Sequence, residues 1–298
     1  MLQAHLWELK DIEIDYAFIT HNCNDAIKSL LRVASEDFYT PQNKPYQTPT
    51  EYLKALHTTG RIIDVKMEAP KNKEAFVKAY GRNDIFGVRD SAKMTLGYEM
   101  RNGDGLASAY FAPIYSDIRN ANNAYHELIE SRLASIDIRF NPHTNDAFIQ
   151  KIEALHLFSL LDLYRSKNLS KYIDVSFENP IGEHTRTNLK PNIAFGVGFG
   201  SYLGRYVSVY AMPIFGYDYV YAHNAYVDMR VGAVLRFHRV RFVGSYDYYL
   251  DINNQRGYTQ SVSAFVGVNL YKQSDIFIKA EMRGERYNVI QTGVSVNF

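Results

Sequence analysis

The sequence predicts a mainly β protein in which a small α+β segment precedes an antiparallel transmembrane-type β-barrel of about twelve strands. Three observations support this prediction. Apolar and polar residues alternate with a period of two through most of residues 92–298. The alternating stretches are about ten residues long and are separated by short polar turns, as in membrane barrels. Tyrosine is abundant, with 24 residues against one tryptophan, and many tyrosines, Tyr249 among them, lie near the ends of the predicted strands, as an interfacial aromatic girdle requires.

The amino-terminal part is predicted to contain short helices and little strand. Residues 1–9 are expected to end a helix, and residues 16–19 to form a short strand. After Cys23, apolar residues recur with helical spacing at Ala26, Ile27, Leu30, Leu31 and Ala34. Asn22 or Asn24 can cap this helix, which places Cys23 at or beside its amino-terminal end.

Cys23 is the candidate catalytic residue. It is the single cysteine of the chain, which excludes an intrachain disulfide and a cysteine-rich metal site. Unpaired N–H groups and the helix dipole at a helix start favour a thiolate, which is the nucleophilic form of cysteine. The alternative is that Cys23 packs under the helix as a small apolar residue.

Several short segments carry a family resemblance: Leu6-Trp7-Glu8-Leu9, Tyr16-Ala17-Phe18-Ile19, Asn22-Cys23 and Leu30-Leu31-Arg32-Val33-Ala34. They resemble the Asn-Cys region of the Lnb-like bacterial periplasmic domain, which is related to the lipoprotein intramolecular transacylase. That domain is similar to permuted papain-type and NlpC/P60-type cysteine hydrolases. In Gram-negative members a carboxyl-terminal β-barrel commonly follows it. The resemblance implies that Cys23 attacks a carbonyl and forms a thioester, without a cofactor, on an acyl or amide substrate of lipoprotein or peptidoglycan type.

One part of the family pattern is missing from this sequence. Family members carry a catalytic histidine well upstream of the cysteine, and neither His5 nor His21 lies in that motif. His21 is also two residues from Cys23, too close in an extended segment for the two side chains to face each other. The amino terminus has no secretory signal pattern. We therefore expect this chain to be the back part of a longer polypeptide, and whether it is an enzyme by itself stays open.

A connecting region follows the cysteine segment. Thr48-Pro49-Thr50-Glu51 is a capping box with proline at the first helical position, which predicts a helix from Pro49 to about Thr59 that Gly60 ends. Residues 62–65 are expected to form a strand. The polar, proline-containing stretch after it is the best domain boundary. We predict an Lnb-like cysteine domain at residues 1–70, a linker at 71–91 and a barrel at 92–298.

The predicted barrel strands each have an apolar and a polar face. Met94, Leu96, Tyr98 and Met100 alternate with Lys93, Thr95 and Glu99, and the last strand separates its valines from Ser295 and Asn297 in the same way. Residues 117–130 are polar and are expected to be a loop with some helix. For residues 148–164 the apolar density fits a helix nearly as well as a long strand.

Alternation alone would also fit a soluble β-sandwich or barrel, so other features decide in favour of a membrane. The polar faces carry opposite charges two residues apart, as in Glu281 with Arg283 and Asp228 with Arg230, which suits a wet lumen. The last residue, Phe298, is an aromatic on an apolar face, which resembles the final strand of bacterial outer-membrane proteins. No run of 18 apolar residues exists, so no transmembrane helix is expected.

Other kinds of site find little support. Gly196, Gly198 and Gly200 alternate with large residues, which indicates a strand against which side chains or a plug pack closely, rather than a phosphate loop. The histidines show no i, i+4 pair, so no metal site is predicted, and a net charge of +1 gives no reason to expect nucleic acid. We predict an outer-membrane protein in contact with lipid, with its amino-terminal part in the periplasm. The alternative function is a non-enzymatic barrel serving as a pore, an anchor or a structural protein.

Overall fold

The structure, a computed structural model, describes residues 23–38, 47–63, 89–119, 128–166, 168–179, 187–204, 206–219, 224–252, 258–271, 273–284 and 287–298. These residues belong to two compact units. Residues 23–38 and 47–63 lie in a helical unit, and the described residues from Arg89 onward lie in a β unit. The predicted boundaries at residues 70, 71 and 91 fall close to or within the undescribed stretch 64–88, so they stay a prediction.

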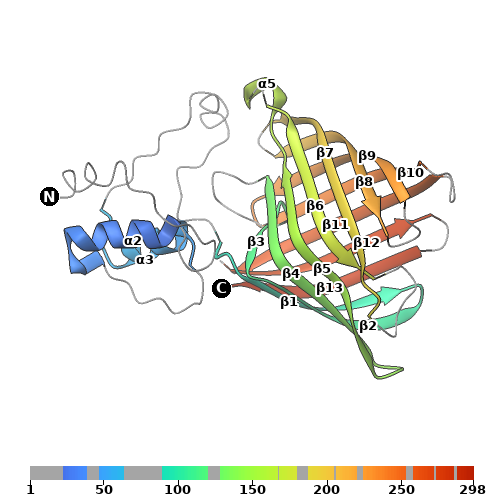
Figure 1. Cartoon of the computed structure of the whole chain (residues 1–298), viewed down its shortest axis with the longest axis horizontal. Helices are drawn as coiled ribbons and strands as arrows, with labels where there is room; N and C mark the ends of the chain where they lie inside the picture. Colours follow the sequence, from blue (N-terminus) through green and yellow to red (C-terminus); the bar gives the residue numbers. More distant parts are fainter. Residues whose placement is uncertain are drawn as a thin grey trace. The chain divides into compact units, whose positions relative to one another are not determined.

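The β unit is a barrel of tilted antiparallel strands (Figure 1). Its strands are β1 (Lys93–Arg101), β2 (Asp104–Ala112), β3 (Ile114–Ser116), β4 (Ile129–Asn141), β5 (Asp146–Ser159), β6 (Ser170–Glu178), β7 (Lys190–Leu203), β8 (Val207–Asp218), β9 (Asn224–Phe237), β10 (Val240–Asp251), β11 (Tyr258–Tyr271), β12 (Ser274–Arg283) and β13 (Tyr287–Asn297). A short helix, α5 (Leu163–Ser166), follows β5.

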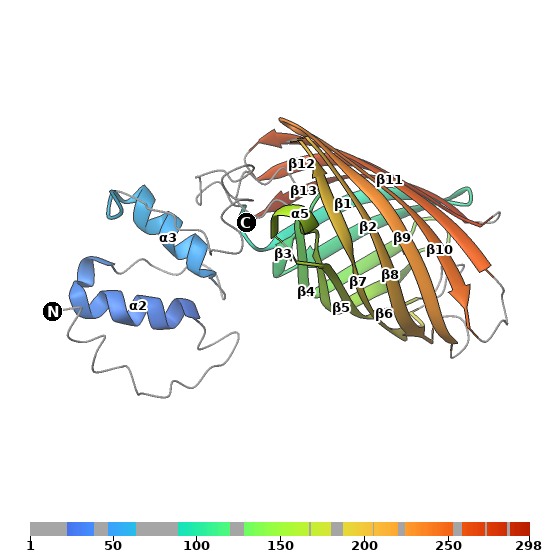
Figure 2. The same cartoon turned by 90° about the horizontal axis from the view of Figure 1, so that it is seen from above.

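The sheet closes on itself at two places. β1 pairs with β13, with Lys93 opposite Asn297, and β2 pairs with β4. The short strand β3 also pairs with β4 and continues the line of β2 beyond Pro113, whose missing N–H interrupts the ladder. The ring formed by the described residues therefore contains twelve strands, as predicted. Viewed from above, the carboxyl terminus and β3 lie at the same end of the barrel (Figure 2).

The two faces of the wall separate as the alternation predicts. On β1, Leu96 and Met100 are 55% and 49% exposed, whereas Glu99 and Arg101 between and beyond them are 2% and 3% exposed. The other strands also carry exposed apolar side chains outside, while their inner faces bury polar side chains and, on β5 to β9, apolar ones as well. This inside-out distribution excludes the soluble alternative with a dry centre. It is the distribution expected of a wall that faces lipid and encloses a polar lumen.

Part of the lumen is filled by apolar side chains and by two segments between strands. The segments contribute Ile118, Leu128 and Leu160, all at most 2% exposed, and Leu160 donates its N–H to the Leu128 carbonyl over 2.9 Å. They pack with inner-face residues of β5 to β9, namely Phe158, Tyr172, Ala194, Tyr202, Tyr210, Met212, Ile214, Tyr226 and Val234. The loop predicted at 117–130 thus folds into the barrel at its described ends.

Glycines on the inner face make room for this filling. A Cβ at Gly200 would lie 2.5 Å from Leu160 Cδ1, so the glycine allows the second segment to approach the wall, as the glycine pattern predicted. Gly232 and Tyr210 are directly opposite on β9 and β8, and a Cβ at Gly232 would lie 2.5 Å from the tyrosine ring. The ring of Tyr210 therefore covers the glycine across the strand pair.

The helical unit contains α2 (Cys23–Ala34), a 3-10 turn η1 (Glu36–Phe38) and α3 (Pro49–Thr58). The predicted capping box is present: Glu51 N–H donates to Thr48 Oγ1 at 3.2 Å, and Thr48 N–H donates to Glu51 at 2.8 Å. Tyr52 is fully buried and its hydroxyl donates to the Phe38 carbonyl at 2.7 Å, while burial raises the pKa of Tyr52 above its ordinary value. Among the described helices, none has both the length and the apolar character needed to span a bilayer.

The structure decides one open local prediction and corrects two others. The segment at 148–164 is mainly strand, because β5 finds partners on both sides and ends at Ser159. Ile62 and Ile63 have no regular structure, and the rest of that predicted strand lies outside the described residues. Tyr249 does not join an interfacial girdle, since it stacks on Tyr226 at 4.6 Å between ring centroids and donates to Asp218 inside the barrel.

Candidate functional site

Cys23, the predicted nucleophile, is the first residue of α2. The prediction that it lies at or beside a helix start is therefore confirmed for its backbone. Residues 1–22, with His5, His21 and the possible cap Asn22, lie outside the described residues. The catalytic role of Cys23 consequently stays a prediction.

The inner wall of the barrel carries networks of charged side chains that the sequence had indicated only in part. The predicted pairs are present, with Arg283 Nη2 at 3.5 Å from Glu281 and Arg230 Nη2 at 3.5 Å from Asp228. Each has a closer partner that the sequence did not identify. Lys279 Nζ lies 2.9 Å from Glu281, and Arg230 Nε pairs with Asp247 on the neighbouring strand.

Glu99 on β1 holds two arginines. Its two carboxylate oxygens accept from Arg101 Nε at 2.7 Å and from Arg139 Nε at 3.1 Å. All three side chains are at most 6% exposed, so the charges have little water to solvate them. Each of these three charges needs a partner within the protein, because one unpaired buried charge costs several kcal/mol.

His156 on β5 lies between two carboxylates. Its Nδ1 is 2.8 Å from Asp174 Oδ2 and its Nε2 is 3.0 Å from Glu130 Oε2. Each ring nitrogen therefore faces a carboxylate oxygen on a neighbouring strand. A bulge between Glu153 and Leu155 brings Glu153 to the same face, three residues from His156. This constellation was missed from the sequence because it depends on the bulge and on strand register.

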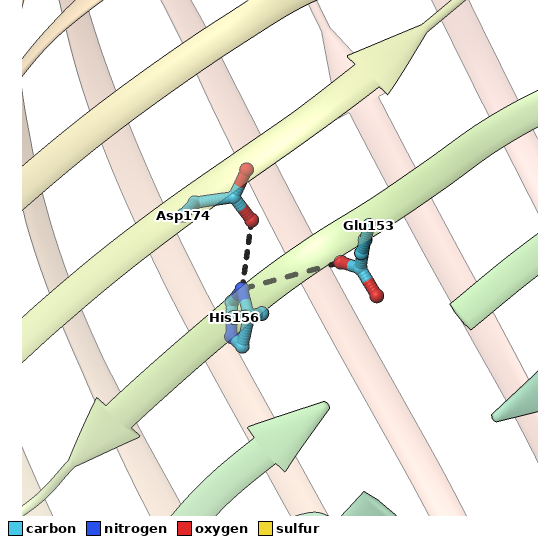
Figure 3. A group of neighbouring side chains, drawn as sticks. All are labelled: Glu153, His156 and Asp174. Atoms are coloured by element: carbon cyan, nitrogen blue, oxygen red, sulfur yellow. Dashed lines mark hydrogen bonds and ion pairs between the residues drawn. The ribbon is translucent and has the colours of Figure 1, made fainter. Parts of the chain in front are cut away.

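Glu153, His156 and Asp174 are residue types that can bind a metal ion, and they converge in the lumen (Figure 3). One candidate ligand atom from each lies within 4.8 Å of the others. However, the ammonium of Lys151 lies 3.2 Å from Glu153 and 3.7 Å from Asp174, and it already supplies a cation to both carboxylates. Arg132 adds a second cation, 3.4 Å from Glu153. The group is thus an internally paired charge cluster, and its geometry gives no reason to add a metal.

Comparison with known families supports the resemblance noted around Cys23. Residues 1–58 match the family model of the Lnb N-terminal periplasmic domain. Among curated proteins, none matches this chain.

Comparison with solved structures finds outer-membrane barrels. The NanC porin aligns with a TM-score of 0.45 and 9% identity, over 69% of this chain and 100% of that chain. An outer membrane channel from Pseudomonas putida F1 aligns with a TM-score of 0.45 and 7% identity, over 78% of this chain and 100% of that one. The outer membrane protein Omp33 of Acinetobacter baumannii aligns with a TM-score of 0.38 and 9% identity, over 71% and 100%.

The location of the chain follows from its wall. A closed sheet leaves no strand edge unpaired, and its exposed outer face is apolar, as the hydrocarbon core of a bilayer requires. Single-chain antiparallel barrels with an even number of strands are typical of bacterial outer membranes. The chain therefore joins a segment that matches the Lnb N-terminal periplasmic domain to a β-barrel in the outer membrane.

Proposed function

We propose that the barrel holds, in the outer membrane, a periplasmic domain in which Cys23 performs thioester chemistry. The observation that carries the proposal is the position of Cys23 at the first residue of α2, within the segment that matches the Lnb periplasmic domain. A helix start favours an anion through its unpaired N–H groups and its dipole, so it suits a thiolate.

The proposed reaction has two steps. The Cys23 thiolate attacks the carbonyl carbon of an ester or amide, an S–C bond forms, and the C–O or C–N bond breaks as the alcohol or amine leaves with a proton. An amine or water then attacks the thioester and releases the thiolate. By family resemblance a histidine supplies the base, and the substrate is an acyl or amide group of lipoprotein or peptidoglycan type.

Because Cys23 is the single cysteine of the chain, thiol chemistry reports on one position. We expect iodoacetamide to alkylate the folded protein at pH 6 at least about tenfold faster than the protein unfolded in guanidinium, because a stabilised thiolate stays populated at lower pH. We also expect a p-nitrophenyl acyl ester to leave a hydroxylamine-sensitive acyl group on the wild-type protein.

The control variants are Cys23→Ser and Cys23→Ala, which should carry no hydroxylamine-sensitive label. The experiment uses the protein expressed from its own gene, so that any residues encoded before Met1 are present. Equal alkylation rates in the folded and unfolded states, together with no acylation, would contradict the proposal.

A second candidate is a non-enzymatic barrel that acts as an anchor or structural protein. The charge clusters of Glu99 and His156 and the apolar filling by Leu128 and Leu160 favour it, because they occupy the lumen with mutually paired side chains. Cells carrying Cys23→Ser would then show the same envelope properties as wild type, whereas deletion of the gene would change them.

A further inference from the structure

The four residues before β1 have no regular structure, yet they are bound to distant parts of the barrel. Residues 89–92 belong to no helix or strand. The Ser91 carbonyl accepts the Tyr115 N–H at 2.7 Å, and the Ala92 carbonyl accepts the Phe298 N–H at 2.9 Å. Tyr115 belongs to β3 and Phe298 follows β13. The segment is therefore held from both sides of β1 before that strand begins.

The side chain of Arg89 reaches the polar inner face of β12. Its guanidinium forms two hydrogen bonds with the Asp275 carboxylate, one of them 2.8 Å long from Nη2 to Oδ1. Asp275 is 5% exposed, whereas the next residue, Ile276, is 39% exposed on the outer face. Two parallel bonds between a guanidinium and a carboxylate fix the orientation of the groups as well as their distance. The pair consequently determines where Arg89 lies on the wall.

The backbone of Asp90 is fixed beside this pair. Its N–H donates to Gln273 Oε1 at 3.2 Å, and its carbonyl accepts from Asn297 Nδ2 at 2.9 Å. The oxygen of the same Asn297 side chain lies 3.5 Å from Arg89 Nη1. Asn297 is also directly opposite Lys93 where β1 pairs with β13. The contacts of residues 89 and 90 thus require the turn before β12, β12 itself and β13 to be in place together.

The Asp275 carboxylate has other partners besides Arg89. It lies 3.4 Å from Asn269 Nδ2 and interacts electrostatically with Lys93. The Lys93 ammonium in turn donates to the Tyr115 hydroxyl at 3.0 Å. If Arg89 were replaced, Asp275 would still have a cation and a hydrogen-bond donor nearby. A change at Arg89 should therefore release the segment before β1 without leaving an isolated buried carboxylate.

We propose that Arg89 is a positioning residue, which with Asp275 and Asn297 forms a lock that fixes the segment preceding β1 to the closed barrel. The tether of the periplasmic domain then starts from a fixed point, and not from a freely pivoting one. A tether fixed at its base restricts the space that the attached domain explores, which raises the effective concentration of that domain beside the membrane. This inference rests on the proposed holding role of the barrel and not on the chemistry of Cys23.

Amide hydrogen exchange, followed by NMR spectroscopy in the full chain folded in micelles, tests the lock. The reporters are the amides that bond to this segment or belong to it, those of Asp90, Tyr115 and Phe298. We expect Arg89→Gln to accelerate exchange of all three at least about tenfold, because the segment opens locally once the guanidinium is lost. Arg89→Lys keeps the charge but not the two parallel bonds, so its acceleration should be smaller.

Arg139→Gln is the matched control. Arg139 is also a buried arginine, 5% exposed, but its partners are Glu99 and Asp137. Without denaturant, where local opening dominates exchange, this variant should leave the three reporter amides at their wild-type rates. The lock is overturned if Arg89→Gln and Arg139→Gln accelerate the reporters equally, or if the reporters already exchange in wild type as fast as in the unfolded chain. If Arg89→Gln fails to fold, Arg89→Lys against the control decides.

Pulse-labelled exchange during refolding tests whether the lock depends on closure. The Asn102 amide donates to the Asn288 carbonyl at 3.0 Å, so it reports on the junction of β1 with β13. We expect the Asp90 amide to gain protection together with that of Asn102. Protection of Asp90 before Asn102 would show that the lock forms without a closed barrel. Neither exchange experiment depends on the labelling of Cys23, so a failure of the lock and a failure of the thioester chemistry are distinguishable.

Discussion

The outer and inner faces of the barrel wall are made by the same strands but follow opposite rules. Outside, side chains such as Leu96 and Ile278 are more than half exposed although they are apolar. Inside, Glu99, Arg139 and Asp174 are at most 5% exposed although they are charged. In a soluble protein the charged side chains would be exposed and the apolar ones buried. The difference shows that the usual link between polarity and exposure does not hold when the solvent outside is lipid.

The largest effect should come from breaking an inner charge network. Glu99→Gln would remove the buried carboxylate that Arg101 and Arg139 share, while Arg101 keeps its bond to Gln150 and Arg139 its pair with Asp137. Removal of one partner of a buried pair costs roughly 3–5 kcal/mol. The free energy of unfolding is measured by urea titration of the barrel refolded in lipid vesicles. Glu178→Gln is the control, because Glu178 is 33% exposed and its pair with Lys151 should contribute at most about 1 kcal/mol. Equal losses in both variants would mean that burial does not set the value of inner pairs.

The next effect should come from placing a charge on the outer face. Leu96 is near the middle of β1 and 55% exposed, so Leu96→Arg puts a guanidinium into hydrocarbon at a cost of roughly 2–4 kcal/mol. The same vesicle titration measures it, with Leu96→Met as the control that keeps the surface apolar. A loss below about 0.5 kcal/mol for the arginine variant would show that this face does not meet the bilayer core.

A smaller effect should separate two glycines on the two faces. Gly232→Val on the inner face would press against the ring of Tyr210, and overpacking of this kind costs roughly 1–3 kcal/mol. Gly244→Val should be tolerated, because the nearest atom to an added Cβ is the Ser263 carbonyl oxygen at 3.8 Å. The free energies of unfolding of the two variants are measured in micelles and compared directly. If Gly244→Val were the more harmful, the proposed role of Tyr210 in covering Gly232 would be wrong.

The sequence was a good guide to what depends on one strand alone. The period of two placed Met94 and Leu96 on one face and Thr95 and Glu99 on the other, and the capping box placed the start of α3. It also paired Glu281 with Arg283, which are two residues apart. These features depend on local geometry, so a single stretch of sequence contains the information.

Features that join distant strands could not be predicted in the same way. Glu130, His156 and Asp174 meet only because β4, β5 and β6 adopt one register, and the bulge near Leu155 changes that register by a residue. Arg119 reaches Phe265 from a polar stretch whose path into the barrel has no periodic signal. For Cys23 the sequence predicted the helix start, while its chemistry depends on partners outside the described residues.

The pairing of β1 with β13 has a consequence for how the protein is assembled. Lys93 and Asn297 are neighbours in space but lie near opposite ends of the β unit in the sequence. The pairing of β1 with β13 can therefore form only after every other strand has been synthesised. Until then two ladders of unpaired N–H and C=O groups remain, one on β1 and one on β12, and neither tolerates hydrocarbon. Insertion and closure of the cylinder should therefore be a single late event. A nascent polypeptide in which β13 has not yet paired would need a chaperone.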